Sequence, residues 1–444
     1  MNWRIPFIHL LLFFTQKKLL DNLKEIERVV CLSSEEICSY QKQRISSLLS
    51  HAYQRVPYYR KILADYGVVV NGAVHLDQFS HLPVLTKEII RLHYNELKSS
   101  DLKSRKWFCN SSGGSSGEPV SFIQDQDYLA WNIAYKLFIK KYGGHNPGER
   151  ELRLWGSERD VLEGKEKISI RLRNWLYNRK DLNTFSISYQ KYDRFILDWN
   201  TYTPGWVEAY VQSIYDFANY LDINGLVVTP PRGIVTSAGT LYEDVKKKLE
   251  EVFRCKIYNR YGSREVGDMA CSCKTSAKLH LAPWSHYFEI LNDALQPVTQ
   301  GEMGGVYVTL LTNYAMPLIR YKIGDIAVPA NAAICSCGIN TPVIAKVIGR
   351  EVHIFKTKTG EKIDGEYFTH LFYHKNWVKK FQVVQKEYDY IEIKIVGNKS
   401  PEDQSEIEKA VRIVMGDDCE IKWFFVEKID LLKSGKFLYT ISEV

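Results

Sequence analysis

Hydrophobic positions recur at helical spacing over much of the first 65 residues, which predicts a helical N-terminal segment. Two series carry this pattern: Leu19, Leu20, Leu23, Ile26 and Val29, and then Ile45, Leu48, Leu49 and Ala52. Pro57 disfavours the helical conformation at Val56. We therefore expect helices before and after this point, and a further short helix capped by Thr86.

The pattern of the middle of the chain is typical of an α/β fold. Asp125 to Lys141 predicts a helix, capped by Asp125 or Asp127 and ended by Gly143-Gly144. The elements expected next are strand 151–156, a charged loop 157–180, helix 206–221, apolar strand 225–230, helix 241–252 and strand 256–258. An apolar run such as 225–230 is typical of a sheet covered on both faces.

The last third of the chain changes character. Residues 287–349 predict an all-β region, whereas strands 381–384 and 391–395 accompany helix 402–414. The sequence therefore predicts an α/β fold with a large N-terminal domain, residues 1–349, which includes a β-rich subdomain. A small α+β domain, residues 350–444, follows a boundary near Gly349-Arg350.

The N-terminal stretch Ile5–Phe14 is apolar and aromatic. It is too short to span a bilayer, which takes ~20 residues. We expect a surface helix docked on the domain, and the alternative is a peripheral membrane contact through residues 1–17.

Composition narrows the classes of function only slightly. The net charge of +7 fits anionic ligands or general solubility, and without a long basic run no nucleic-acid partner is predicted. Nine cysteines without a secretion signal indicate a reducing compartment, so we expect a cytoplasmic protein. Nothing in the sequence predicts the oligomeric state.

A run of small hydroxylated residues, Ser111 to Pro119, is the first candidate for chemistry. Its glycines and serines can present N–H groups and hydroxyls to a phosphate chain, and the alternative is a flexible linker. A P-loop is disfavoured, because Glu118 follows Gly117 where that motif needs lysine. A second hydroxyl and glycine loop, Thr236–Thr240, follows an expected strand, where α/β folds bind ligands.

Three further segments carry polar groups suited to a nucleotide. Tyr261 can flank a planar base, and Glu265 is a hard oxygen ligand suited to Mg²⁺. Asp325 can accept both hydroxyls of a ribose, and Lys436 is a lysine beside a glycine. Taken singly, the segments could equally be a strand-to-helix turn, a Gly-Asp turn and a solvated basic tail.

Together, these segments resemble the adenylate-forming superfamily of acyl-CoA synthetases and related ligases. The matching segments, in family order, are 111–119, 237–239, 261–265, 320–325, 349–350 and 434–436. The chain most resembles the phenylacetate–CoA ligase group, in the branch found with capsule and O-antigen polysaccharide synthesis. The helix that enters Val56–Arg60 and the paired cysteines carry that closer resemblance.

The resemblance implies roles for individual residues. Ser111, Ser112, Gly113, Gly114, Ser115, Ser116 and Gly117 would wrap the β- and γ-phosphates of ATP. The loop Ser237, Ala238 and Gly239 and the segment Asn259, Arg260, Tyr261, Gly262 and Ser263 would line the nucleotide. Asp325 would bind the ribose, with Arg320 near it and near the α-phosphate. Glu265 would hold Mg²⁺, Lys436 would stabilise charge during adenylation, and a hinge near Arg350 would move the C-terminal domain.

The cysteine pairs resemble the structural zinc site of the same group. Four of five residues would bind the ion, with Cys271 or Cys273 spare: Cys271, Cys273, His280, Cys335 and Cys337. The alternative is that these are buried free thiols.

The resemblance implies an enzyme that adenylates a carboxylic acid with MgATP and passes the acyl group to an acceptor. The leading version uses an aryl or small organic acid and coenzyme A. The alternative acceptor is an amine or hydroxyl of an amino acid or sugar. A hypothesis from another functional class is that the protein is a nucleotide-binding scaffold without catalytic activity.

Overall fold

The structure is a computed structural model, and it divides into two compact units. The first holds most of residues 1–347, and the second holds residues 348–444 together with 324–326. The residues described are 2–112, 120–154, 168–182, 192–330, 335–350, 354–372, 375–430 and 437–444. The division into an adenylation domain and a lid domain stays a prediction.

The helical N-terminal segment is confirmed. Its helices are α1 (Arg4–Thr15), α2 (Lys17–Val29), α3 (Ser34–Arg55) and α4 (Pro57–Asp65). A capping box begins α3, because Ser33 and Glu36 each accept a hydrogen bond from the other's backbone N–H. Helix α3 ends at Arg55, and the extended Val56 separates it from Pro57, which begins α4. A short helix follows in α5 (Lys87–Leu92), capped by Thr86 as predicted.

Strands β3 (Trp107–Ser111) and β4 (Ser121–Asp125) form an antiparallel hairpin that leads into α6 (Gln126–Tyr142). Asp125 caps α6 by accepting a hydrogen bond from the Tyr128 N–H at 2.9 Å. Its other oxygen accepts from the backbone of Tyr314 and Ala315. The buried carboxylate of Asp125 therefore fixes the start of α6 against the β-rich part of the first unit.

The first unit is built around an eleven-stranded sheet in the described residues, with the order β12-β13-β14-β15-β11-β10-β9-β8-β7-β5-β6. Strands β6, β5, β7, β8 and β9 run parallel. The pairs β9–β10, β10–β11, β11–β15 and β12–β13 are antiparallel. The parallel strands are β5 (Glu151–Leu154), β6 (Arg179–Leu182), β7 (Trp206–Tyr210), β8 (Gly233–Ser237) and β9 (Lys256–Ser263). The others are β10 (Gly267–Ser272), β11 (Leu279–Leu281), β12 (His286–Leu291), β13 (Gly304–Leu310), β14 (Tyr321–Pro329) and β15 (Val343–Arg350).

Helices cover both faces of the parallel strands. One face packs on α9 (Tyr192–Tyr202), α10 (Val211–Ile223) and α11 (Glu243–Phe253). On the other face, Trp206, Val235 and Tyr258 form a hydrophobic cluster with Trp131 and Tyr135 of α6. The sheet is thus sandwiched, and α6 lies over the face that carries the polar side chains described below.

Three local predictions were wrong. Residues 206–210 form strand β7, so the helix begins only at Val211. Residues 225–230 form no strand, because Pro230 and Pro231 lack the N–H groups of a central strand, and β8 comes later. The segment expected as a charged loop contains α8 (Ile168–Leu176) and the edge strand β6 among its described residues.

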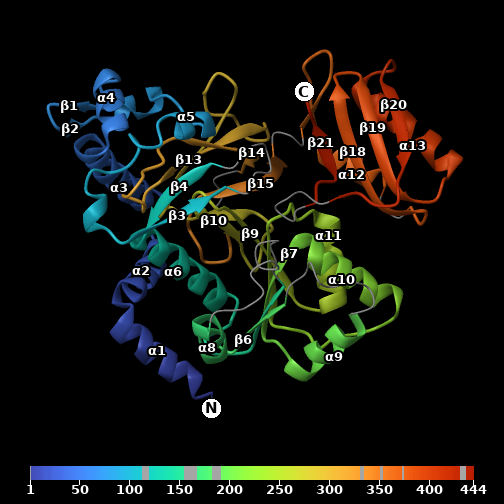
Figure 1. The fold of residues 1–444 in the computed structure, drawn as a ribbon, viewed down its shortest axis with the longest axis horizontal. Helices are drawn as coiled ribbons and strands as arrows, with labels where there is room; N and C mark the ends of the chain where they lie inside the picture. Colours follow the sequence, from blue (N-terminus) through green and yellow to red (C-terminus); the bar gives the residue numbers. More distant parts are fainter. Residues whose placement is uncertain are drawn as a thin grey trace. The chain divides into compact units, whose positions relative to one another are not determined.

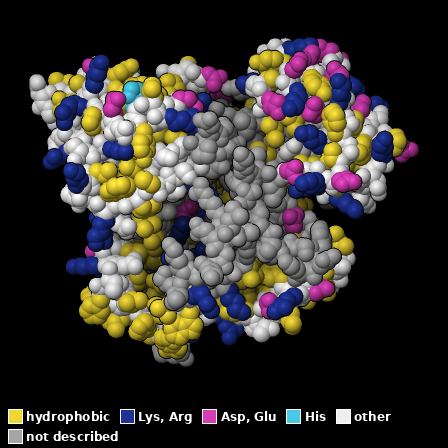
Figure 2. All heavy atoms as spheres, viewed as in Figure 1, with side chains coloured by type: hydrophobic (Ala, Val, Ile, Leu, Met, Phe, Trp, Pro, Cys, Tyr) yellow, Lys and Arg dark blue, Asp and Glu magenta, His cyan; other side chains and the backbone are white. Residues whose placement is uncertain are grey.

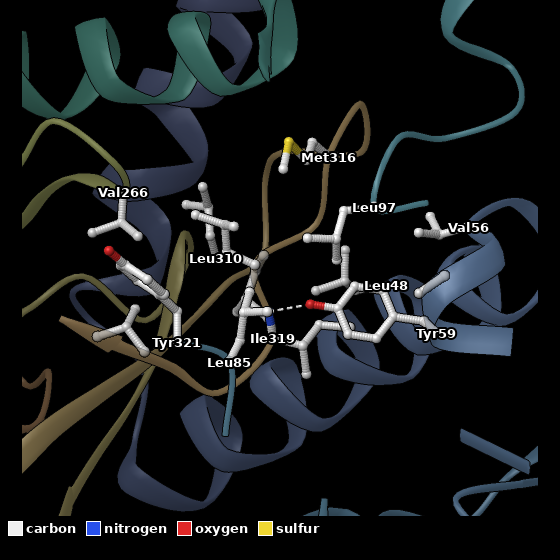
Figure 3. Close-up of a cluster of buried hydrophobic side chains, with 14 of the residues drawn as sticks. Leu48, Val56, Tyr59, Leu85, Leu97, Val266, Leu310, Met316, Ile319 and Tyr321 are labelled. Carbon is white, nitrogen blue, oxygen red and sulfur yellow. Dashed lines mark hydrogen bonds between the residues drawn. The ribbon is translucent and has the colours of Figure 1, made fainter. Parts of the chain in front are cut away.

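A second hydrophobic cluster joins the N-terminal helices to the antiparallel strands (Figure 3). Leu48, Val56 and Tyr59 pack there with Leu310 and Ile319. The buried Tyr59 hydroxyl donates to the Pro317 carbonyl at 3.1 Å and accepts from the Ile319 N–H at 3.2 Å. These two hydrogen bonds hold α4 against the segment that leads into β14.

The second unit is a small α+β structure, as predicted. Its strands are β16 (Ile354–Lys356), β17 (Lys362–Asp364), β18 (Val378–Glu387), β19 (Tyr390–Gly397), β20 (Glu420–Phe425) and β21 (Thr440–Ser442). The last four form one sheet in the order β20-β19-β18-β21, packed with α12 (Gly365–His370) and α13 (Pro401–Met415). The predicted fold class is therefore confirmed for both units.

Among the described residues, none of the helices has the length and continuous apolar character that crossing a bilayer requires.

Candidate active site and metal site

Several predicted nucleotide-binding residues lie at the carboxyl edge of the parallel strands. Strand β8 ends at Ser237, and Ala238 adopts φ 63°, so the backbone turns sharply before Gly239. A Cβ at Gly239 would lie 3.3 Å from the Val211 side chain, tighter than most carbon contacts. Open α/β sheets bind ligands outside this edge. The Ser237–Gly239 loop therefore occupies the position expected of a ligand-binding turn.

The next predicted segment, 259–263, is part of strand β9 rather than a turn. The Asn259 N–H donates to the Ser272 hydroxyl of β10 at 2.8 Å. A Cβ at Gly262 would lie 2.6 Å from the Gly267 carbonyl oxygen, so only glycine permits the close approach of β9 and β10. Tyr261 is half-buried and packs edge-on against Phe288.

Glu265 lies in the turn between β9 and β10 and is buried. Its carboxylate accepts a hydrogen bond from the Tyr321 hydroxyl at 3.4 Å, near the limit for such a bond. The Gln124 side chain donates to the carbonyls of Arg264 and Glu265, which fixes the turn against β4. A single carboxylate with weak protein contacts fits Mg²⁺, which prefers one or two carboxylates, waters and substrate phosphates.

Asp325 and Arg350 lie on the neighbouring strands β14 and β15 and meet in a salt bridge. Arg350 Nε lies 2.8 Å from Asp325 Oδ1, and the Asp325 side chain is only 8% exposed. Gly324, at φ +84°, allows the local turn of the strand. The predicted ribose carboxylate and the predicted hinge arginine are therefore in direct contact.

Arg320 is buried directly before β14 and makes several polar contacts. Its side chain is 1% exposed and pairs with both oxygens of Glu289. It also donates to the backbone carbonyls of Ser80 and Leu82, and its own carbonyl accepts from the Leu85 N–H. These contacts hold residues 80–85 against β14, and the predicted role of Arg320 near the nucleotide stays a prediction.

Parts of the predicted site lie outside the described residues, namely Gly113–Gly117 and Lys436. Ser111 and Ser112 are described, and they lie at the end of β3 where the connection to β4 begins. The Ser112 N–H donates to the Val120 carbonyl, and the Val120 N–H donates to the Ser112 hydroxyl at 3.0 Å. The two ends of the predicted phosphate loop are therefore held together.

A row of charged side chains lies on the sheet face beneath α6, and the sequence reasoning missed most of it. In the strand register, Arg153 pairs with Asp181 on one side and with Glu208 on the other, so the three share this face. Arg260 belongs to the same face, two residues beyond Tyr258 on β9. The signal was present in the sequence, because a charge inside a strand buried on both faces is unusual.

The row is tightly paired at the amino end of the strands and more loosely at the carboxyl end. Lys140 Nζ lies 2.6 Å from Glu151, and Arg179 contacts the same carboxylate at 3.1 Å. Toward the carboxyl end, Arg260 binds Glu208 at 2.7 Å. The remaining pairs are longer: Arg153–Glu208 3.6 Å, Arg260–Asp268 3.4 Å and Lys136–Asp268 3.7 Å.

The basic side chains of this row act on the carboxylate of Glu208. Burial raises the pKa of Glu208, but Arg260 and Arg153 outweigh that effect and hold it well below the usual range. Asp268 Oδ2 is buried without a hydrogen-bond partner among the described residues. The Lys136 side chain is 39% exposed. The Lys136–Asp268 end of the row therefore combines polar side chains with access from solvent.

The structure brings together four of the five predicted metal ligands. The donor atoms of Cys273, His280, Cys335 and Cys337 all lie within 4.8 Å of one another. Cys273 Sγ is 3.6 Å from Cys335 Sγ, and Cys337 Sγ is 3.4 Å from His280 Nε2. Zn–S and Zn–N bonds of ~2.3 Å and ~2.0 Å in a tetrahedron would separate the ligands by ~3.8 Å and ~3.5 Å. The four ligands therefore fit a tetrahedral zinc ion.

Cys271 is the residue left out of this group. It pairs with His280 in the β10–β11 ladder, but its side chain is buried in the hydrophobic cluster beneath α6 with Tyr135 and Trp284. Burial raises the pKa of the Cys271 thiol to about 12. Hydrogen bonds from Thr275 and Cys337 outweigh burial at Cys335 and lower its pKa to about 7.

The fold of this chain is similar to the folds of solved structures. It resembles 2-hydroxyisobutyryl-CoA ligase in the postadenylation state, in complex with R3-HIB-AMP, with a TM-score of 0.72 at 16% identity. The match covers 94% of this chain and 92% of that one. The fold is that of the adenylate-forming ligases.

The sequence relatives are more specific. Residues 355–443 match the CapK C-terminal domain family. The chain is 23% identical to Protein CapK of Staphylococcus aureus over 446 residues, which covers 98% of this chain and 95% of CapK. It is 22% identical to the phenylacetate-coenzyme A ligase of Thermus thermophilus over 334 residues, covering 72% and 71% of the two chains. The predicted resemblance, and the predicted class of an adenylate-forming ligase, are confirmed by these relatives.

Proposed function

We propose that the protein activates a carboxylic acid with MgATP, giving acyl-AMP and pyrophosphate, and then passes the acyl group to an acceptor. The observation that carries the proposal is the buried Asp325 carboxylate held by Arg350 on adjacent strands. A carboxylate oriented in this way can accept both hydroxyls of a ribose. The Ser237–Gly239 turn and the Glu265 carboxylate supply the groups expected for the rest of the nucleotide.

The proposed chemistry needs no protein nucleophile, because the carboxylate oxygen of the acid attacks the α-phosphate of ATP and pyrophosphate leaves. Ser111–Gly117 wraps the outer phosphates, and Glu265 holds Mg²⁺, which neutralises phosphate charge. Lys436 stabilises the charge that develops at the α-phosphate.

Acid-dependent exchange of labelled pyrophosphate into ATP tests the first step. The carboxylic acids tested in this assay are aryl, fatty, hydroxy and amino acids. Lys436→Ala is expected to lower the exchange rate by ~10²–10³-fold, the usual effect of removing one oriented charge-stabilising group. Lys433→Ala is the control from the same tail. Absence of exchange with every acid, while ATP still binds, contradicts the proposal and favours the scaffold alternative.

The acceptor proposed for the second step is coenzyme A. The support comes from a relative, the phenylacetate-coenzyme A ligase of Thermus thermophilus. Adding coenzyme A to an exchanging mixture should convert the acid into a thioester, detected by mass spectrometry. If a product forms only with an amine or a sugar, coenzyme A is not the acceptor. The proposed adenylation step would still stand.

We further propose that the acid is polar rather than aryl. The row beneath α6 places Lys136, Asp268 and Arg153 toward the carboxyl edge, the edge that Ser237 also reaches. A neutral aromatic group would offer no hydrogen bond to Lys136 or to Asp268 Oδ2, and a buried polar atom that lacks a hydrogen bond costs several kcal/mol. An amino or hydroxy acid would supply hydrogen bonds to them.

Lys136→Gln tests this assignment. The variant should lower kcat/KM for the preferred polar acid by roughly tenfold to a hundredfold, the effect of losing one hydrogen bond to a charged group. Lys141→Gln is the matched control, because Lys141 lies on the same helix and pairs with Glu27 on the surface. Equal effects of the two variants, or a wild-type preference for aryl acids, would refute a polar pocket at this place.

We also propose that Cys273, His280, Cys335 and Cys337 hold a structural zinc ion, with Cys271 outside the site. The distances between the donor atoms support this ligand set. The ion would join the β10–β11 turn to the segment that leads into β15.

A further inference from the structure

Helix α1 carries hydrophobic side chains on two opposite faces. Ile8 and Leu12 are buried. Opposite them, Trp3 in the N-cap position, then Phe7, Leu10 and Phe14, follow one another at spacings of four, three and four residues, which keeps them in one stripe. Their exposed fractions are between 47% and 75%, and Phe13 beside the stripe is 60% exposed.

The exposed stripe continues onto α8. The ring centroids of Trp3 and Trp175 lie 6.0 Å apart, and Trp175 and Leu172 are 57% and 63% exposed. We call this surface the apolar N-terminal patch; it comprises Trp3, Phe7, Leu10, Phe13, Phe14, Leu172 and Trp175. Figure 2 shows hydrophobic side chains gathered at the lower left, where Figure 1 places α1 and α8.

The helix that carries the patch is fixed to the first unit. The Asn2 side chain donates to the Gly148 carbonyl at 2.6 Å, and Arg4 Nε donates to the Trp175 carbonyl at 3.4 Å. A Cβ on Gly148 would lie 2.9 Å from Arg4 Cβ, so α1 approaches this turn more closely than another residue would allow. The buried face of α1 thus holds the exposed face in a defined orientation.

The charged side chains of the two segments that carry the patch are all basic. Arg4 stacks on Trp3 and Trp175, with its guanidinium carbon 4.9 Å and 5.4 Å from their ring centroids. Lys17 follows the helix, Lys18 beside it pairs with Asp127 of α6, and Arg171 and Arg173 are exposed on α8. Residues 2–18 and 168–176 contain no aspartate or glutamate. Two copies of this patch would bring like charges together, which disfavours self-association.

We propose that the apolar N-terminal patch docks on a membrane surface that contains anionic lipid. Aromatic and aliphatic side chains on one face, with basic residues at the edge, are typical of helices that lie in the plane of the lipid interface. Tryptophan side chains sit at that depth because their rings are amphipathic. The 12 residues of α1 are too few to span the bilayer and suffice to lie along its surface.

The test uses the full chain with sedimenting vesicles of phosphatidylcholine, alone or mixed with phosphatidylglycerol. The wild-type protein should sediment with the anionic vesicles and much less with the neutral ones, and salt should weaken the binding. Leu10→Ser with Phe14→Ser should lower the partition coefficient by at least about tenfold, because membrane binding scales with the apolar area buried. Circular dichroism and a urea unfolding curve establish that the variant remains folded.

Matched controls separate the patch from general hydrophobicity. Ile223 and Ile413 are each 80% exposed on other helices, so Ile223→Ser with Ile413→Ser should leave vesicle binding unchanged. Arg171→Glu with Arg173→Glu should weaken binding to anionic vesicles without touching the aromatic stripe.

The proposal is overturned if the wild-type protein stays in solution with anionic vesicles, or if Leu10→Ser with Phe14→Ser binds them equally well. It is also overturned if sedimentation velocity finds a dimer that the same double variant abolishes while vesicles are not bound. That result would make the patch a contact between copies of this chain.

Discussion

Replacing Cys273 by serine tests the ligand set of the metal site. Serine has nearly the size of cysteine, but a neutral hydroxyl is a poor ligand for zinc, which prefers thiolate and imidazole. Cys271→Ser is the matched control two residues away, on a thiol that packs in the hydrophobic cluster beneath α6. We expect Cys271→Ser to retain the ion and Cys273→Ser to lose it.

The size of the effect follows from binding linkage. If free zinc stands at one hundred times its dissociation constant, the bound ion stabilises the folded protein by about 2.7 kcal/mol. The three remaining ligands of Cys273→Ser would bind zinc too weakly to supply this stabilisation. At ~2 °C per kcal/mol, the low end of the range for chains of 150–250 residues, the melting temperature should fall by about 5 °C.

The assay is the zinc content of dialysed protein by mass spectrometry, combined with thermal unfolding with and without a chelator. Wild type and Cys271→Ser should hold about one zinc per chain and lose about 5 °C when chelated. Cys273→Ser should hold none, and the chelator should not shift its melting temperature. Zinc retained in Cys273→Ser, or lost equally from Cys271→Ser, would refute the ligand set derived from the distances between the sulfur and nitrogen atoms.

Two further predictions concern buried polar groups of the first unit. Tyr59→Phe removes the hydroxyl between the Pro317 carbonyl and the Ile319 N–H, so urea unfolding should show a loss of ~2–4 kcal/mol. The half-buried Tyr58→Phe should cost less than ~1 kcal/mol, and equal losses would contradict the reasoning. Burial lowers the pKa of His286 from 6.5 to about 4, so between these values the unfolded chain binds more protons. Stability should be fully present above pH 6.5 and fall as the pH decreases toward 4. His286→Gln should flatten this slope between pH 7 and 5, and an unchanged slope would exclude His286 as its source.

Much of the fold was predictable because local signals agreed with the tertiary structure. Asp125 caps α6 and Pro57 separates α3 from α4, and both depend on neighbours within a few residues. Residues 225–230 are hydrophobic but do not form the predicted strand. Pro230 and Pro231 have no backbone N–H group to donate to a neighbouring strand. Leu226 and Val227 are exposed in the structure.

The candidate site was less predictable, because its distinctions depend on long-range contacts. Sequence alone could not choose between Cys271 and Cys273, since both lie near His280, and only the position of Cys335 and Cys337 separates them. Arg320 and Asp325 belong to one motif-like segment. One is committed to Glu289 and two backbone carbonyls, and the other forms a salt bridge with Arg350.

The position of β15 has a consequence for how the chain can fold during its synthesis. In the order of the large sheet, β15 lies between β14 and β11, so it connects the strands of residues 286–329 with the block that begins at β11. Until residue 350 has left the ribosome, β14 and β11 both lack a neighbour and expose unpaired backbone groups. Such edges invite pairing with other chains. At ~5–20 residues per second, the interval between β14 and the end of β15 lasts a few seconds at most. A ribosome that pauses in this interval would therefore leave the nascent chain at its most aggregation-prone stage.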